Sequence, residues 1–151
     1  MRPAVASFQV LRASDSTPLA VVGVSAFTET TLATNTAYGI RVRAVNATAA
    51  GELSPAATAF TFAAVPSSTA ILAVHVSSIA LAWNALGNPP ATPYALERST
   101  NGVLFSALTT ITTDNHIDIN LAGNTTYYYR VRARNGDSVS TLFDSTAGAF
   151  L

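Results

Sequence analysis

One segment occurs twice in this chain, first as Leu32-Ala33-Thr34-Asn35-Thr36-Ala37-Tyr38-Gly39-Ile40-Arg41-Val42-Arg43-Ala44-Val45-Asn46 and again as Leu121-Ala122-Gly123-Asn124-Thr125-Thr126-Tyr127-Tyr128-Tyr129-Arg130-Val131-Arg132-Ala133-Arg134-Asn135. Ten of the aligned residue types agree at one offset of 89 residues, from Leu32 to Leu121. An offset of this length is domain-sized and exceeds the repeat of a solenoid, so the sequence predicts two copies of one fold. Phe8-Gln9-Val10-Leu11-Arg12 matches Tyr94-Ala95-Leu96-Glu97-Arg98 at a slightly shorter offset.

Both copies alternate between apolar and basic residues, as a half-buried strand requires. Tyr38, Ile40 and Val42 point one way, and the arginines between them point the other way. The second copy is expected to contain six further strands, at 71–76, 79–83, 93–98, 103–108, 116–119 and about 140–150. Seven short antiparallel strands separated by regular turns are typical of a β-sandwich, so the predicted fold class is all-β.

Composition restricts the function. The 151 residues are 49% hydrophobic and 11% charged, with a formal net charge of zero, so no field steers the chain towards nucleic acid or anionic lipid. A surface without Lys and rich in Ser and Thr predicts an extracellular or cell-surface location. The absence of cysteine excludes disulfides, thiolate metal sites and a Cys nucleophile. No apolar window is long enough for a membrane span, and residues 1–8 do not have the pattern of a secretory signal.

Candidate chemistry is sparse, and each candidate has a structural explanation. His75 and His116 lack the nucleophile partners of a hydrolase, so we predict no catalytic residue and no enzyme. The segment 114–120 carries the oxygen and nitrogen donors Asp114, His116, Asp118 and Asn120 on one side. Ligands along a strand diverge too far for one ion, so neither metal nor cofactor is expected. The outward arginines are either a ligand patch or, preferably, partners of acids such as Glu97. Asn46 and Asn124 fit both glycosylation acceptors and turn residues, and the turn is preferred.

Residues 65–151 resemble a fibronectin type III domain. The resemblance rests on Pro66, on Trp83 in Ile79-Ala80-Leu81-Ala82-Trp83, and on Leu121 with Tyr127 before Tyr129-Arg130-Val131-Arg132-Ala133. It implies two immunoglobulin-like antiparallel sandwiches in tandem, with Trp83 in the core and the Tyr127 hydroxyl bonded to the preceding loop backbone. The core residues predicted from sequence and resemblance together are Trp83, Tyr94, Leu96, Leu121, Tyr127, Tyr129 and Val131, and Leu32, Tyr38, Ile40 and Val42 in the first repeat.

The first repeat, residues 1–64, lacks the two opening strands of the family and the core Trp, whereas residues 65–151 form a complete repeat. Strands C to G are expected in the first repeat, and Phe8, Val10, Ile40 and Val42 lose their facing layer. Either the chain is a fragment cut within a repeat, or strands from a neighbour fill the gap, or the first repeat is a degenerate half-sandwich.

The expected function is therefore a non-catalytic extracellular structural or interaction module. It would be a self-assembling surface-fibre subunit whose partner is a copy of itself, through strand addition or swapping at Phe8, Val10, Ile40 and Val42. The other reading is a spacer or accessory segment of a secreted carbohydrate-active enzyme or adhesin.

Overall fold

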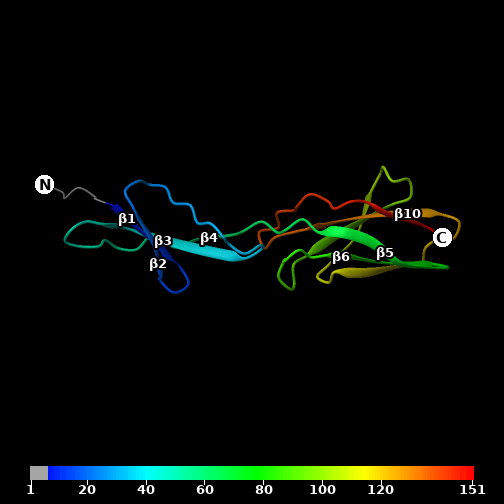
Figure 1. Ribbon diagram of the computed structural model, residues 1–151, viewed down its shortest axis with the longest axis horizontal. Coiled ribbons are helices and arrows are strands. Elements are labelled where there is room, and N and C mark those ends of the chain that lie inside the picture. The colour runs from blue at the N-terminus through cyan, green and yellow to red at the C-terminus, as the bar shows by residue number, and fades with distance from the viewer. Residues whose placement is uncertain (1–6) are drawn as a thin grey trace. The chain divides into compact units, whose positions relative to one another are not determined.

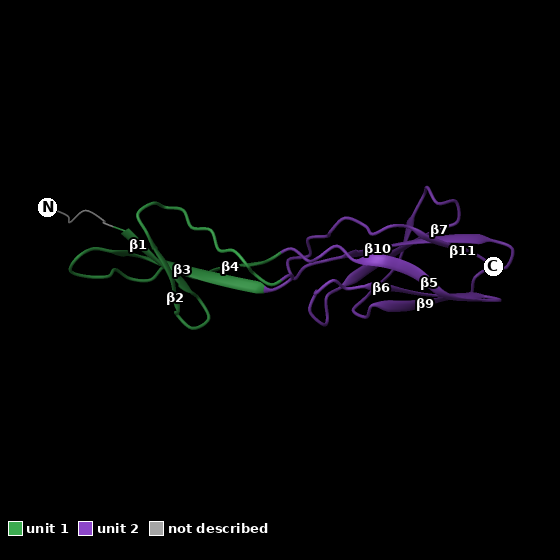
Figure 2. Ribbon diagram, viewed as in Figure 1, with its two compact units in different colours: residues 1–33, 37–61 green, residues 34–36, 62–151 purple. Residues whose placement is uncertain are grey.

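The computed structural model describes residues 7–151, which form eleven strands and no helix (Figure 1). The sequence prediction for the signal region falls largely on residues 1–6, outside the described part. The chain divides into two compact units, one of residues 1–33 and 37–61 and the other of residues 34–36 and 62–151 (Figure 2). The predicted all-β class is confirmed.

Unit 1 is a single antiparallel sheet of four strands in the order β2-β1-β3-β4. The strands are β1 (Ser7–Arg12), β2 (Pro18–Val22), β3 (Ala37–Val45) and β4 (Ala57–Phe60). Strand β3 contains the first copy of the repeated segment, and its period-2 pattern gives the sheet one apolar face. This unit therefore contains only one of the two layers of a sandwich.

Unit 2 contains both layers. One sheet has the order β11-β10-β7-β8 and the other the order β5-β6-β9. The strands are β5 (Ser67–His75), β6 (Ser78–Asn84), β7 (Tyr94–Ser99), β8 (Ser106–Ile111), β9 (Asn115–Ile119), β10 (Thr126–Ala133) and β11 (Ala147–Phe150). Ile79 and Leu81 from β6 and Tyr129 and Val131 from β10 have no exposed surface, so the core lies between the two sheets.

Several strand boundaries in unit 2 differ from the prediction, among them the start of β5, which lies at Ser67 instead of residue 71. Strand β8 begins at Ser106 instead of residue 103, because the Asn101 side chain accepts hydrogen bonds from the backbone N–H groups of Val103 and Leu104 and holds them in a turn. The last strand covers only Ala147–Phe150, and Ser140 forms just an isolated bridge with Arg134.

Unit 1 also lacks one strand of the predicted set C to G. No strand forms between Val22 and Ala37, where the counterpart of β9 was expected. In unit 2, β9 pairs with β6 and with no other strand, so it exists because β6 supplies its hydrogen-bond partner. Unit 1 has no strand equivalent to β6 within residues 7–61, and the segment stays irregular.

Candidate functional site

The apolar side of the unit 1 sheet is the most distinctive surface of the chain. Directly paired residues share a face, and the register pairs Val10 with Val42 and Phe8 with Val22. Ile40 lies two residues before Val42 on β3 and therefore has the same orientation. We call the surface formed by Phe8, Val10, Val22, Ile40 and Val42 the open face.

Equivalent positions in the two repeats differ in burial because only one repeat has a second sheet. Val42 is 37% exposed, whereas its counterpart Val131 is 0% exposed. Phe8 is half-buried, whereas its counterpart Tyr94 is buried. In unit 2 these positions belong to the same core cluster as Ile79, Leu81 and Trp83 of β6. The open face is thus a core surface without its second layer.

Two pockets lie along this side of unit 1. The larger, about 490 Å³, is lined by the open face and by residues 24–27. The smaller, about 340 Å³, is lined by Leu32, Tyr38 and residues 57–61. Ile40 lines both pockets. The irregular segment after β2 therefore covers the sheet only in part.

An ion pair anchors this irregular segment to the sheet. Arg12, at the end of β1, pairs with Glu29, and its guanidinium lies 5.4 Å from the centre of the Tyr38 ring. Unit 2 repeats the arrangement, since Arg98 pairs with Asp118 and lies 5.5 Å from the Tyr127 ring centre. Glu29 and Asp118 are separated by the repeat offset, so the segment carrying Glu29 is the counterpart of β9.

The backbone of this segment is unpaired. Within residues 7–151, residues 24–32 make no backbone-to-backbone hydrogen bond. Among the described residues, the one side-chain hydrogen bond to a backbone group of this segment comes from Thr31, whose hydroxyl donates to the carbonyl of Thr30. A row of unpaired N–H and C=O groups next to an apolar surface is a template for strand addition.

The residues predicted as core differ between the repeats. Within unit 2 the cluster of buried side chains contains Trp83, Tyr94, Leu96, Leu121, Tyr127, Tyr129 and Val131. In unit 1, Leu32, Tyr38 and Ile40 are only half-buried and Val42 is exposed. The physical reason for this difference is the missing sheet. Val10, assigned to the assembly surface, is 1% exposed because neighbouring strands and residues 24–27 enclose it.

The tyrosine corner implied by the family resemblance is present. The Tyr127 hydroxyl oxygen accepts a hydrogen bond of 3.0 Å from the Ala122 N–H. Tyr38 makes the corresponding bond of 3.1 Å with Ala33 in unit 1. The connection before the repeated strand therefore has the same local geometry in both repeats.

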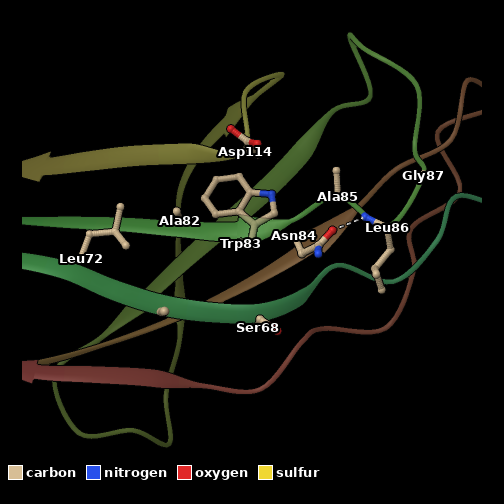
Figure 3. Close-up of a pocket in the computed structure, with 10 residues that line it drawn as sticks. Ser68, Leu72, Ala82, Trp83, Asn84, Ala85, Leu86, Gly87 and Asp114 are labelled. Atoms are coloured by element: carbon tan, nitrogen blue, oxygen red, sulfur yellow. Dashed lines mark hydrogen bonds between the residues drawn. The ribbon is translucent and has the colours of Figure 1, made fainter.

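An open groove of about 550 Å³ lies beside Trp83 (Figure 3). Its lining includes Ala82, Asn84, Leu86 and Asp114. Trp83 is only 5% exposed, and its ring packs edge-on against Tyr94 at a centroid distance of 5.5 Å. Because the indole is buried, it offers no ring face on which a planar ligand or a sugar could stack.

The remaining candidate metal-ligating and catalytic residues either have a structural role or do not lie together. Asp118 is buried and pairs with Arg98, whereas Asp114 is exposed. Among residues 7–151, no group of three or more His, Asp or Glu side chains is placed to hold a metal ion. His75 is exposed at the end of β5. The region described also contains no helix long and apolar enough to cross a membrane.

Two of the outward arginines, Arg130 and Arg132, pair with Glu97, the acid named in the preferred interpretation. Arg130 donates to Glu97 at 2.5 Å, and Arg132 lies 3.7 Å from the same carboxylate. Both guanidinium groups also lie over the Phe143 ring, at 4.0 and 4.5 Å from its centre. In unit 1, Arg43 donates to Gln9 instead. The charged groups of Arg130 and Arg132 therefore interact with neighbouring side chains of the same unit.

Sequence reasoning missed several residues of the site. Val22, Val24 and Phe27 line the larger pocket, and the Arg12–Glu29 pair links the irregular segment to β1. The Arg12–Glu29 pair had a signal in the sequence, because Glu29 and Asp118 are separated by the repeat offset and Arg12 matches Arg98. The pocket itself depends on the path of an irregular segment, which has no periodic signature.

No protein-family model matches the chain, and no curated protein matches it. Among solved structures, an Fn3-like protein from Clostridium thermocellum is 34% identical, with a TM-score of 0.49, over 57% of this chain and 90% of that one. The fibronectin type III domain of human fibronectin type III domain containing protein 3 is 21% identical, with a TM-score of 0.50, over 58% of this chain and 84% of that one. Titin domains A168–A170 are 17% identical, with a TM-score of 0.54, over 99% of this chain and 55% of that one.

The sequence identity and coverage of the Clostridium thermocellum protein define the class, which is a β-sandwich module of the fibronectin type III kind. The titin and human domains support the same fold. This chain belongs to the fibronectin type III family. Domains of this family are generally non-catalytic modules.

Proposed function

We propose that this protein is a non-catalytic structural or interaction module whose first unit is completed by strands from a neighbouring chain. The neighbouring chain is a second copy of the same protein, so the module self-assembles. One observation carries the proposal: Val42 is 37% exposed where its repeat counterpart Val131 is 0% exposed. The same strand sequence is a core strand in unit 2 and an uncovered strand in unit 1.

The energetic argument concerns apolar surface and backbone polarity together. Covering the open face removes several half-buried side chains from water, at about 1 kcal/mol each for side chains that are already half-covered. A donated strand also satisfies the unpaired backbone of residues 24–32. A small molecule that filled the pocket would cover apolar side chains but would not pair with the backbone of residues 24–32.

We propose an extracellular or cell-surface location for this module. The support is compositional: the chain is rich in Ser and Thr, its basic residues are all Arg, and only 11% of its residues are charged. A surface of this kind carries few of the mixed charges that commonly keep intracellular proteins soluble.

The test is the assembly state across a concentration series, by light scattering and negative-stain electron microscopy. Ordered oligomers or fibres are expected, and Val42→Glu should abolish them by placing a charge on the open face. Val21→Glu is the matched control, because Val21 is 62% exposed and points to the other side of the sheet. A dispersed monomer at every concentration would refute self-assembly and favour a spacer or accessory role within a larger protein.

A further inference from the structure

The outward arginines of the two repeats have different neighbours. In unit 2 the strand register places Glu97 directly opposite Arg130, and the carboxylate accepts hydrogen bonds from Nε and Nη2 of Arg130. In unit 1 the register places Leu11 opposite Arg41, which is the counterpart of Arg130 at the repeat offset. An alkyl side chain therefore stands in unit 1 where unit 2 has the carboxylate that neutralises its arginines.

The arginine side chains of unit 1 have unpaired donors. Nε of Arg41 has no hydrogen-bond partner within residues 7–151, whereas Nε of Arg130 donates to Glu97 at 2.9 Å. Arg43 donates from Nε to the uncharged side chain of Gln9. In the described part of the chain, neither Arg41 nor Arg43 forms an ion pair or lies over an aromatic ring. Both are partly exposed, so a ligand can reach their guanidinium groups.

The acids of unit 1 do not take the place of Glu97. Asp15 accepts a hydrogen bond from the N–H of Thr17, and Glu29 pairs with Arg12. Glu52, the remaining acid among residues 7–61, is exposed and forms no ion pair with any described residue. The two positive charges on this side of the sheet are therefore not neutralised within unit 1.

We propose that Arg41 and Arg43 bind the carboxylates of an acidic segment in a different protein. Unit 2 shows the chemistry that suits such a pair, since the Glu97 carboxylate lies 2.5 Å from Arg130 and 3.7 Å from Arg132. Hydrogen bonds between guanidinium and carboxylate groups are stronger than those between neutral groups. Residues two apart on a strand are separated by about 7 Å, so an extended segment with acids at alternate positions matches the spacing of the two arginines. The site faces away from the open face and goes beyond the proposed function.

A second copy of this chain does not contain such a segment. Its acids are isolated in the sequence, and the two that lie closest together, Asp114 and Asp118, are separated by three residues. Asp118 is also buried and paired with Arg98. Acids at alternate positions of an extended segment must therefore come from a different polypeptide.

The experiment titrates a short blocked peptide with glutamates at alternate positions into the isotopically labelled full chain and follows the Nε–H NMR signals of the arginines. The signals of Arg41 and Arg43 should shift and saturate, whereas those of Arg130 and Arg132 should not move, because Glu97 already pairs with them. A peptide with glutamine in place of glutamate should shift none of these signals. Added salt should weaken the binding, because it screens exposed charges.

Two substitutions test the site itself. Leu11→Glu installs the acid that unit 2 has at this position and should lower the affinity for the peptide by about tenfold, as expected for a lost hydrogen bond between charged groups. Because Leu11 is buried, Arg41→Gln is the second variant, with the same expected loss. Arg130→Gln makes the matched change in unit 2 and should leave the affinity unchanged. The titration is repeated in the Val42→Glu protein, whose substitution lies on the opposite face, so that self-assembly does not affect the result.

Unchanged signals of Arg41 and Arg43 would overturn this inference, as would an equal shift of the Arg130 signal. A shift of the Arg41 signal with protein concentration alone, lost in Glu52→Gln, would identify a second copy as the donor and overturn the assignment to a different protein. Self-assembly and peptide binding are measured separately. Failure of one therefore leaves the other standing.

Discussion

Arg98 and Asp118 form an ion pair in unit 2, with Nη1 of Arg98 2.9 Å from Oδ2 of Asp118. The Tyr129 hydroxyl donates to the same carboxylate at 2.8 Å. Burial first, and then the bond to Asp118, raise the pKa of the Tyr129 hydroxyl above its ordinary value. Asp118 thus joins β9 to β7 and β10, which lie in the opposite sheet.

Replacing Asp118 by Asn should destabilise unit 2 by about 2 kcal/mol, because charged hydrogen bonds are lost while Arg98 keeps partial access to water. Urea denaturation followed by Trp83 fluorescence measures the change. Asp114→Asn makes the same chemical change at an exposed position nearby and should have little effect. Equal stability of the two variants would show that the Arg98 pair contributes nothing.

Tyr127→Phe should lower the free energy of unfolding by about 1 to 2 kcal/mol, because the Ala122 N–H loses its acceptor in a partly buried position. Tyr128→Phe removes a hydroxyl from the adjacent residue of β10, on the opposite side of the strand, and is the matched control. Thermal unfolding of both variants gives the comparison. A larger loss for Tyr128→Phe would contradict a stabilising tyrosine corner.

Trp83→Ala should cost about 3 to 5 kcal/mol, the range for truncating a large buried aromatic side chain. The indole is 5% exposed and packs on Tyr94, so its removal leaves a cavity between the sheets. Calorimetry measures the change without the lost fluorophore, and Val103→Ala, at a position 77% exposed, serves as control. A melting temperature close to that of the unmodified chain would place Trp83 outside the core.

Stability should fall in acid partly through Asp144. Burial acts to raise the pKa of this carboxyl, but hydrogen bonds from the Thr69 hydroxyl and N–H outweigh it and lower the pKa below 3.8. A carboxyl whose pKa is lower in the folded than in the unfolded state stabilises the fold at pH values above its unfolded-state pKa. This stabilisation is lost as the pH falls through the folded-state pKa. The free energy of unfolding should therefore decline below about pH 4, and less steeply in Asp144→Asn. Parallel pH profiles would disprove the role of Asp144.

The sequence predicted the elements that depend on local pattern. The repeat at offset 89, the alternation around Val131 and the spacing of Leu121 and Tyr127 were enough for the strand class, the tyrosine corner and the family. The start of β8 was wrong by three residues, because the Asn101 side chain holds the following N–H groups in a turn. A side-chain turn of this kind competes with strand pairing and leaves no periodic signal.

Sequence alone determined which residues have the character of a core: Val42 and Val131 occupy one position of one repeated strand and are the same residue type. Only the tertiary structure decided that Val131 is enclosed and Val42 is not, and that residues 26–30 remain irregular although Glu29 holds the same place as Asp118. The physical reason is that burial and strand pairing are properties of two surfaces together. A strand sequence specifies one of those surfaces, and the presence or absence of β6 supplies the other.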